Sequence, residues 1–244
     1  MKTTLFALTL LMLSAPQAKA QDKSVLELFG ITSAQEAGAI AVPVFSDPVP
    51  ARQTDLARKY AHLDPKGQVP ADLLATALAY YDANLKKIHN PYFLSVVDFS
   101  QFAGKRRFFI IDMRTGEVRA LLVSHGAGSD PGNTGFATLF SDAPRSKQSS
   151  LGFYRTGEVY YGAFGLSMRL DGLSATNHRA RSRAVVLHAY KPVTETYAGP
   201  SWGCLGVSPS VIAELTKDLK HGSIIYAGFS GSAAPYSKGG LDIF

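Results

Sequence analysis

The part of the chain that most constrains its fold is residues 91–229, where short β-rich runs alternate with turns. The runs are 93–99, 107–113, 118–124, 159–161, 184–187, 205–207 and 223–226. They are short and rich in Val, Ile, Phe and Tyr, which is typical of strands. Thr115-Gly116 separates two runs as a tight turn does, which predicts a β-hairpin over 108–123. Only 211–220 has the features of a helix. We therefore predict a mainly β (α+β), β-sandwich-like domain over 91–229.

The preceding stretch, residues 21–90, has a different pattern. Apolar residues recur at three- and four-residue spacing over 49–63 and 71–88, which predicts two amphipathic helices. Pro70 opens the second helix and Asn90-Pro91 ends it. Residues 21–90 are therefore predicted to form a small N-terminal helical lobe. Residues 230–244 are rich in Gly, Ser and Ala and are predicted to be a flexible tail.

The first twenty residues have the layout of a secretory signal peptide. Lys2 precedes the apolar run 5–13, and Ala18-Lys19-Ala20 is a small-residue cleavage site. The apolar run is about half of the ~20 residues that a membrane span needs, so we expect no stable membrane insertion. Cleavage after Ala20 removes two of the 25 Lys and Arg and leaves 23 against 19 acidic residues, a net charge of +4. We expect an exported protein of the bacterial periplasm.

Several function classes are disfavoured by what the sequence contains. One Cys cannot form an intrachain disulfide, and the few scattered Cys and His do not fit a structural zinc site. There is no Gly-rich phosphate loop, no evident pair of catalytic carboxylates and no Gly-x-Ser-x-Gly nucleophile motif. The net charge is too small to indicate nucleic-acid binding. We expect no metal, no cofactor and no nucleic-acid partner.

Cys204 is the strongest candidate for chemistry. Most free cysteines are buried and inert, but an unpaired thiol in an exported chain risks oxidation and mispairing. Ser201-Trp202-Gly203 precede it at the point where a loop enters an apolar run. Glycine allows close backbone approach, so amides near Gly203 and Cys204 are candidates for an oxyanion hole. The pattern favours a nucleophile.

A cysteine nucleophile needs a base, which is usually histidine. His188 ends the run 184–187 and lies 16 residues before Cys204, so a returning strand can bring the two side chains together. His125 also ends a run and is the alternative base. Either imidazole could instead be a structural residue that is satisfied by a backbone carbonyl.

Arginines at 179, 181 and 183 precede His188 and would share one face if the segment were extended. Such charges are usually solvated, but Arg183 or Arg181 is a candidate to bind a substrate carboxylate. Aromatic side chains could wall a groove, although they are more often core. These are Tyr154, Tyr160, Tyr161 and Trp202.

A strand-ending His followed after about 16 residues by Ser-x-Gly-Cys resembles the signature of bacterial L,D-transpeptidase catalytic domains. The Trp form, Ser201-Trp202-Gly203-Cys204, is similar to the murein L,D-transpeptidase branch of exported proteins. Further segments similar to that branch lie between 95 and 227. They are 98–100, 107–112, 124–126, 149–154, 161–162, 165–173 and 183–188.

The resemblance implies a mostly β L,D-transpeptidase catalytic fold and a cysteine acyltransferase acting on peptidoglycan stem peptides. Cys204 would be the nucleophile and His188 the base, while Ser201, Trp202 and Gly203 would shape the oxyanion loop. The expected reaction forms a thioester with a tetrapeptide stem, releases D-Ala and transfers the stem to an amine. His125 and Tyr161 match family positions and are candidate substrate-binding residues.

Two residues depart from the family pattern. Pro200 stands where the family commonly has Arg, and Gly206 cannot supply the Arg that better-known members place two residues after the Cys. The carboxylate-binding residue is therefore open. Two other functions also stay open, namely hydrolysis of the same bond and a wall-binding module without turnover. The sequence predicts no particular protein partner.

Overall fold

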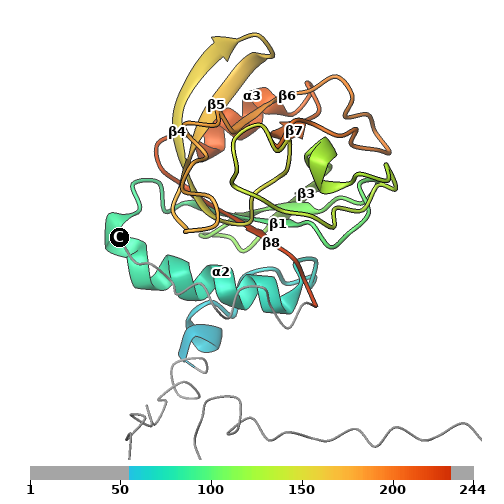
Figure 1. Ribbon diagram of the computed structural model, residues 1–244. Helices are drawn as coiled ribbons and strands as arrows, with labels where there is room; N and C mark the ends of the chain where they lie inside the picture. Colours follow the sequence, from blue (N-terminus) through green and yellow to red (C-terminus); the bar gives the residue numbers. More distant parts are fainter. Residues whose placement is uncertain (1–54, 232–244) are drawn as a thin grey trace, which may run out of the picture. The chain divides into compact units, whose positions relative to one another are not determined.

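A computed structural model describes residues 55–231 of the chain. The predicted signal peptide, residues 21–54 of the predicted lobe and residues 232–244 lie outside the described residues. Figure 1 shows a sheet with the helix α2 (Ala71–Asn84) on one side. The strands are β1 (Phe93–Asp98), β2 (Phe108–Asp112), β3 (Val118–Leu121), β4 (Gly152–Gly162), β5 (Gly165–Gly172), β6 (Val186–Ala189), β7 (Leu205–Val207) and β8 (Ile224–Gly228). The prediction of a mainly β domain is confirmed.

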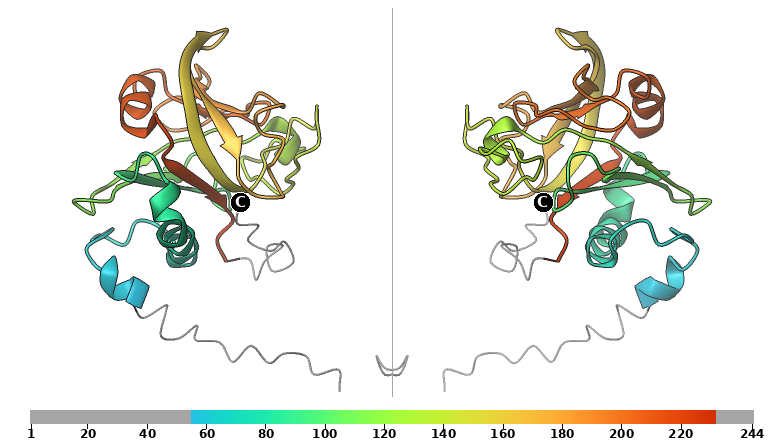
Figure 2. Two further views of the ribbon diagram at one scale, coloured as in Figure 1. Left: turned by 90° about the vertical axis from the view of Figure 1, so that its left-hand side faces the viewer. Right: turned by 90° about the vertical axis from the view of Figure 1, so that its right-hand side faces the viewer.

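All eight strands belong to one sheet, in the order β3-β2-β1-β8-β4-β5-β6-β7. The predicted β2–β3 hairpin is confirmed, with Ile111 opposite Val118. β1–β8 and β6–β7 are parallel pairs, and the remaining neighbours are antiparallel. Figure 2 shows the long β4–β5 hairpin standing away from the β2 end of the sheet.

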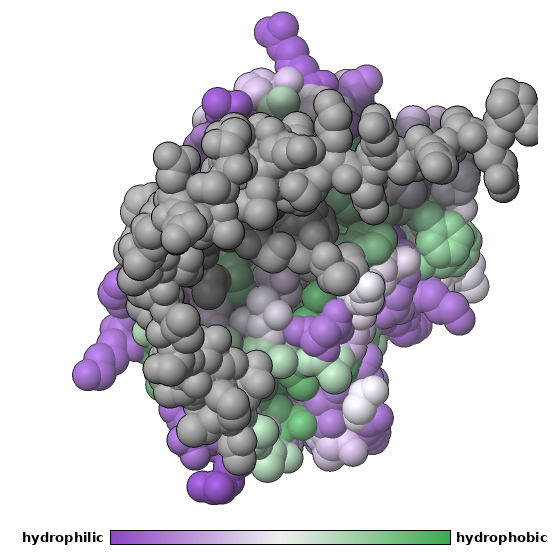
Figure 3. Space-filling view, turned by 60° about the horizontal axis from the view of Figure 1, so that its bottom comes forward, coloured by the Kyte–Doolittle hydropathy of each residue, from purple (hydrophilic) through white to green (hydrophobic). Residues whose placement is uncertain are grey.

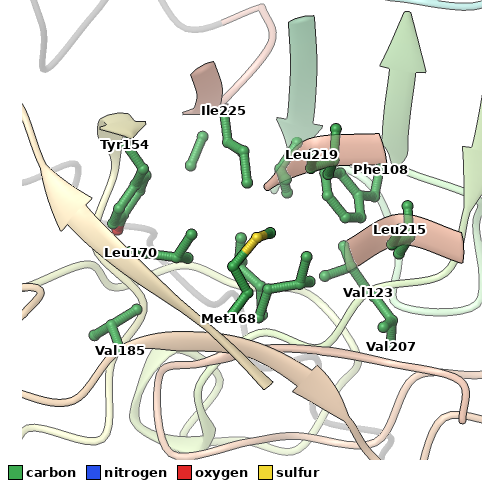
Figure 4. Packing of buried hydrophobic residues seen from close by; sticks show 14 of the residues in the cluster. Phe108, Val123, Tyr154, Met168, Leu170, Val185, Val207, Leu215, Leu219 and Ile225 are labelled. Carbon is green, nitrogen blue, oxygen red and sulfur yellow. The ribbon is translucent and has the colours of Figure 1, made fainter. Parts of the chain in front are cut away.

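A hydrophobic core fills the space between the two halves of this curled sheet. It combines side chains of β1 and β2 with those of β5, β6, β7 and the helix α3 (Ile212–Leu219). Figure 4 shows these side chains gathered around Met168, which is fully buried. Apolar residues on β5 alternate with polar ones, so one face of this strand enters the core. The core thereby fixes β6 and β7, the two strands next to which the candidate site lies.

A second core joins α2 to the other face of the sheet. Leu73, Ala77, Leu78 and Tyr81 are buried, as the helical spacing predicts, and they pack with residues of β1, β2, β4 and β8. The predicted helix over 71–88 ends at Asn84 and continues as the 3₁₀ turn η2 (Leu85–Lys87). Figure 3 views the side on which α2 lies; among the described residues visible there, hydrophobic and hydrophilic side chains are interspersed. Helix and sheet thus share one core.

Some local features of the structure differ from what the sequence predicts. Residues 165–172 form β5, which was not predicted, and the predicted run 184–187 is shifted to Val186–Ala189 because Ala184 adopts a left-handed φ of 55°. The segment 175–184 consists of turns, so the expected extended face of arginines is wrong.

At the C-terminal end of the described residues, Ser230 Oγ donates a hydrogen bond to Asp72 in α2 at 2.9 Å. Within residues 55–231, no helix has the length and apolar character that crossing a membrane requires.

Candidate active site

An open pocket of about 840 Å³ lies beside β6 and β7. It is lined by residues from the segment 144–147, the β4–β5 turn, the turn before β6 and the loop before β7. These residues are Pro144, Arg145, Lys147, Phe164, Ser182, Arg183, Ala184, His188, Tyr190, Ser201, Trp202 and Cys204. The pocket therefore contains both residues that the sequence singled out for nucleophilic chemistry.

The loop before β7 presents Cys204, and Ser201 holds this loop in place. Ser201 is buried; its amide donates to the carbonyl of His125 at 2.7 Å and its hydroxyl donates to the carbonyl of Cys204 at 2.7 Å. The hydroxyl also accepts a hydrogen bond from the Gly203 amide at 3.1 Å. The Gly203 amide, predicted to face an oxyanion, is therefore engaged within the loop.

Glycine is required at position 203. Its φ is +109°, and a Cβ there would lie 2.6 Å from the carbonyl oxygen of Gln148. An L-residue is both strained and obstructed in this conformation. The close approach packs the loop 201–204 directly against the segment around Gln148.

The thiol of Cys204 is half-buried and protonated at neutral pH. Burial raises its pKa above the usual value, and this effect outweighs a hydrogen bond from the Val186 backbone and the charge of Arg183, which both lower it. Sγ lies 3.6 Å from the carbonyl oxygen of Ala184, which it faces as a hydrogen-bond donor. The resting site holds a thiol, so a base has to remove its proton before it can attack.

His188 lies on β6 opposite Gly206, two residues beyond Cys204 on the neighbouring parallel strand. Its Nδ1 lies 2.7 Å from the carbonyl oxygen of Ala189. A carbonyl only accepts hydrogen bonds, so Nδ1 carries the proton and Nε2 has a free lone pair. Burial lowers the pKa of His188, which keeps the imidazole neutral and able to act as a base.

Two aromatic rings enclose the imidazole of His188. Phe164, in the β4–β5 turn, lies with its ring centroid 4.6 Å away, and Tyr190 makes an edge contact at 5.4 Å. No hydrogen bond joins Sγ to the imidazole in the described part of the chain, since the thiol faces Ala184. Catalytic hydrogen bonds are often long in unliganded sites and shorten when substrate binds.

Arg183 lines the pocket, but its guanidinium is occupied. Its side chain is only 5% exposed. Nη1 donates to Ser141 O at 3.0 Å and to Ser150 Oγ at 2.5 Å, while Nη2 donates to Gln148 O at 2.8 Å. Its contacts hold the segment 141–150 against the loop of Cys204. A carboxylate would have to displace these partners to bind Arg183 in a bidentate way.

Arg181 and Tyr161 lie outside the pocket. Arg181 forms ion pairs with Glu158 and Asp171 and lines a separate depression beside β4. Tyr161 is 83% exposed near the end of β4. Their predicted roles in substrate binding gain no support from this placement, and they stay predictions.

His125 is buried behind the loop rather than exposed in the pocket. Its Nδ1 accepts a hydrogen bond from Arg107 Nη2 at 2.8 Å, and its Nε2 lies 3.6 Å from Asp130 Oδ2. Burial, reinforced by the charge of Arg107, lowers the pKa of His125 to about 4. The backbone carbonyl of His125 accepts a hydrogen bond from the Ser201 amide and so helps to hold the nucleophile loop. Its buried imidazole is poorly placed to act as the base.

The pocket also contains residues that sequence reasoning missed. Arg145 and Lys147 contribute charge and Phe164 and Tyr190 contribute aromatic walls. Tyr190 follows the strand-ending His188 by two residues, and this position could have indicated that it lies near the pocket. Nothing in the sequence near Arg145 or Lys147 indicates that these residues line the pocket. Across residues 55–231, no group of His, Cys, Asp and Glu has the arrangement of a metal site.

Comparison with known protein families identifies this domain. The L,D-transpeptidase catalytic domain family matches residues 66–227, which is more than half of the chain and includes the whole pocket. The chain therefore belongs to this family, as the resemblance indicated. The narrower branch with the Ser-Trp-Gly-Cys motif stays a prediction. No curated protein sequence matches the chain.

Solved structures to which the chain is similar include several L,D-transpeptidases. One from Mycobacterium smegmatis is 18% identical with a TM-score of 0.37, and the match covers 56% of this chain and 58% of that one. L,D-transpeptidase 1 from Mycobacterium tuberculosis is 17% identical with a TM-score of 0.32, over 55% and 60%. One from Stackebrandtia nassauensis is 13% identical with a TM-score of 0.33, over 75% and 79%. The chain thus spans under two thirds of the length of the two mycobacterial proteins.

Proposed function

We propose that this protein is a peptidoglycan L,D-transpeptidase that acts in the periplasm after export by its N-terminal signal peptide. Cys204 is the nucleophile, His188 is the general base and acid, and the donor is a tetrapeptide stem. The observation that carries the proposal is the shared pocket of a protonated thiol and a neutral imidazole whose Nδ1 is fixed as a donor.

In the first half-reaction, His188 Nε2 takes the thiol proton and the sulfur attacks the carbonyl carbon of the bond between the third residue and D-Ala. A tetrahedral adduct forms, the C–N bond breaks and His188 returns the proton to the leaving nitrogen of D-Ala. A thioester between Cys204 and the third residue remains.

In the second half-reaction, an amine of another stem attacks the thioester. His188 accepts the proton that the amine nitrogen loses and passes it to the departing sulfur, which restores the Cys204 thiol. One feature supports transfer at this site. His188 is buried and flanked by the rings of Phe164 and Tyr190, which leaves little room for water beside the imidazole.

The direct test is to incubate the protein with tetrapeptide muropeptides and to measure its intact mass and the products. We expect an acyl adduct that disappears in Cys204→Ala and new cross-linked dimers. His188→Ala should lower the rate on the order of 10²-fold or more. The matched control is His62→Ala, an exposed histidine outside the pocket. Tripeptides without dimers would show hydrolysis instead, and the absence of any adduct on Cys204 would refute the proposal.

A further inference from the structure

The pocket is positively charged, and none of the residues that line it is acidic. Its three cations are Arg145, Lys147 and Arg183. Arg183 is buried, and its guanidinium N–H groups donate hydrogen bonds to residues of the segment 141–150. Arg145 and Lys147 line the pocket and are both exposed. These two residues are the cations that a ligand can reach.

The Lys147 ammonium is held at the nucleophile loop. Its Nζ lies 4.7 Å above the ring of Trp202, two residues before Cys204, and Trp202 is 75% exposed. The backbone around Lys147 is anchored as well: its carbonyl accepts a hydrogen bond from Gly128 at 3.0 Å, and the next residue, Gln148, is bound by Arg183. The cation is therefore positioned relative to the thiol by protein contacts on both sides.

The guanidinium of Arg145 has no hydrogen bond or ion pair with any residue of the part of the chain described by the structure. Both Arg145 and Lys147 adopt left-handed backbone conformations, with φ of 64° and 56°. Non-glycine residues in this region cost about 1 kcal/mol or more, and they persist where the surrounding structure holds them. The segment 145–147 is thus held in a shape that presents two cations at one pocket.

From this geometry we propose that Lys147 and Arg145 bind a carboxylate of the donor peptide and determine which donors react. This inference rests on the proposed function. It gives the chain a carboxylate-binding site in place of the arginines that are missing at Pro200 and Gly206. An ammonium and a guanidinium both form charge-assisted hydrogen bonds with a carboxylate, and the guanidinium can do so through two parallel N–H groups. The carboxylate is either that of the terminal D-Ala or, in a stem whose third residue is meso-diaminopimelate, the free carboxylate of that residue's side chain.

The test measures binding without turnover, by titration calorimetry of the full chain carrying Cys204→Ala with a synthetic tetrapeptide stem. Adding Lys147→Gln or Arg145→Gln should raise Kd on the order of tenfold each, and raising the ionic strength should weaken binding to the parent far more than to the double variant. Lys105→Gln removes an exposed cation outside the pocket and should leave Kd unchanged.

Two amidated peptides identify the carboxylate, one blocked at the terminal D-Ala and one at the third residue's side chain. The peptide that lacks the bound carboxylate should lose affinity for the parent and should no longer respond to Lys147→Gln. Equal Kd values for all the variants, or no binding of the free peptide, would overturn the inference.

The same proteins with Cys204 intact separate this inference from the proposed function. We expect Lys147→Gln and Arg145→Gln to raise KM and leave kcat nearly unchanged, because the cations contact the donor and not the reacting bond. Charge-dependent binding without any acyl adduct would refute the function and support the anion site. Normal adduct formation with unchanged KM in the double variant would refute the site and support the function.

Discussion

Gly203→Ala is predicted to damage both stability and activity, because the nucleophile loop leaves no room for a side chain. At φ +109° the backbone is in a region that L-residues rarely adopt, which costs about 1–3 kcal/mol. The new Cβ would also lie 2.6 Å from the carbonyl oxygen of Gln148, and a backbone atom cannot rotate away as a side chain can. Such overpacking adds about 1–3 kcal/mol. We expect the free energy of unfolding to fall by about 3 kcal/mol or more.

The matched control is Gly67→Ala. Gly67 has φ +60°, and no atom lies within 4 Å of the position of its Cβ. This variant isolates backbone strain, which costs about 1 kcal/mol. Urea unfolding of both variants measures the difference, and the rate of Cys204 acylation per folded molecule shows whether the loop has moved. If Gly203→Ala and Gly67→Ala lower the free energy of unfolding by the same amount, the close contact of the loop with Gln148 contributes nothing beyond backbone strain, and our reasoning is wrong.

Three further predictions concern charge and burial. Burial raises the pKa of Cys204, so the rate at which iodoacetamide alkylates the native protein should increase with pH up to and beyond pH 9. A rate that levels off below pH 7 would show a stable thiolate and contradict this. Burial lowers the pKa of His125 to about 4, so between pH 6.5 and 4 the unfolded chain binds a proton that the folded chain does not. As the pH falls through this range, the free energy of unfolding should decrease by up to about 3 kcal/mol. In His125→Gln the decrease should be smaller. Arg107→Met should lower the free energy of unfolding by about 3 kcal/mol in urea titrations, because the buried carbonyl of Val123 and the partly buried carbonyl of Gln101 lose their donor. A change below about 1 kcal/mol would contradict this.

The strands and the candidate nucleophile were predictable because their determinants are local. The turn at Thr115-Gly116 specifies its own hairpin, and a lone cysteine after Ser-Trp-Gly is visible in four residues. β5 was also encoded locally, since Leu166, Met168 and Leu170 alternate with polar residues, but the strand went unassigned.

The surroundings of the nucleophile depend on contacts between distant segments. Arg183 was expected to bind a substrate carboxylate, yet its partners lie between 141 and 150, more than thirty residues away in the chain. Lys147 reaches the site only because its segment packs on Trp202. No periodicity or short motif encodes such contacts, so the pocket's charge could be assigned only from the three-dimensional arrangement.

The parallel pairing of β6 and β7 has a consequence for how this protein can be altered. Strand register, with Leu187 opposite Leu205, brings His188 and Cys204 to the same pocket, and the number of residues that connect them does not. The connection turns at the exposed residues Thr194 to Thr196, which do not line the pocket. Extra residues inserted after Glu195 should therefore be accepted with little change in turnover, and a chain cut there should regain activity when its two fragments associate.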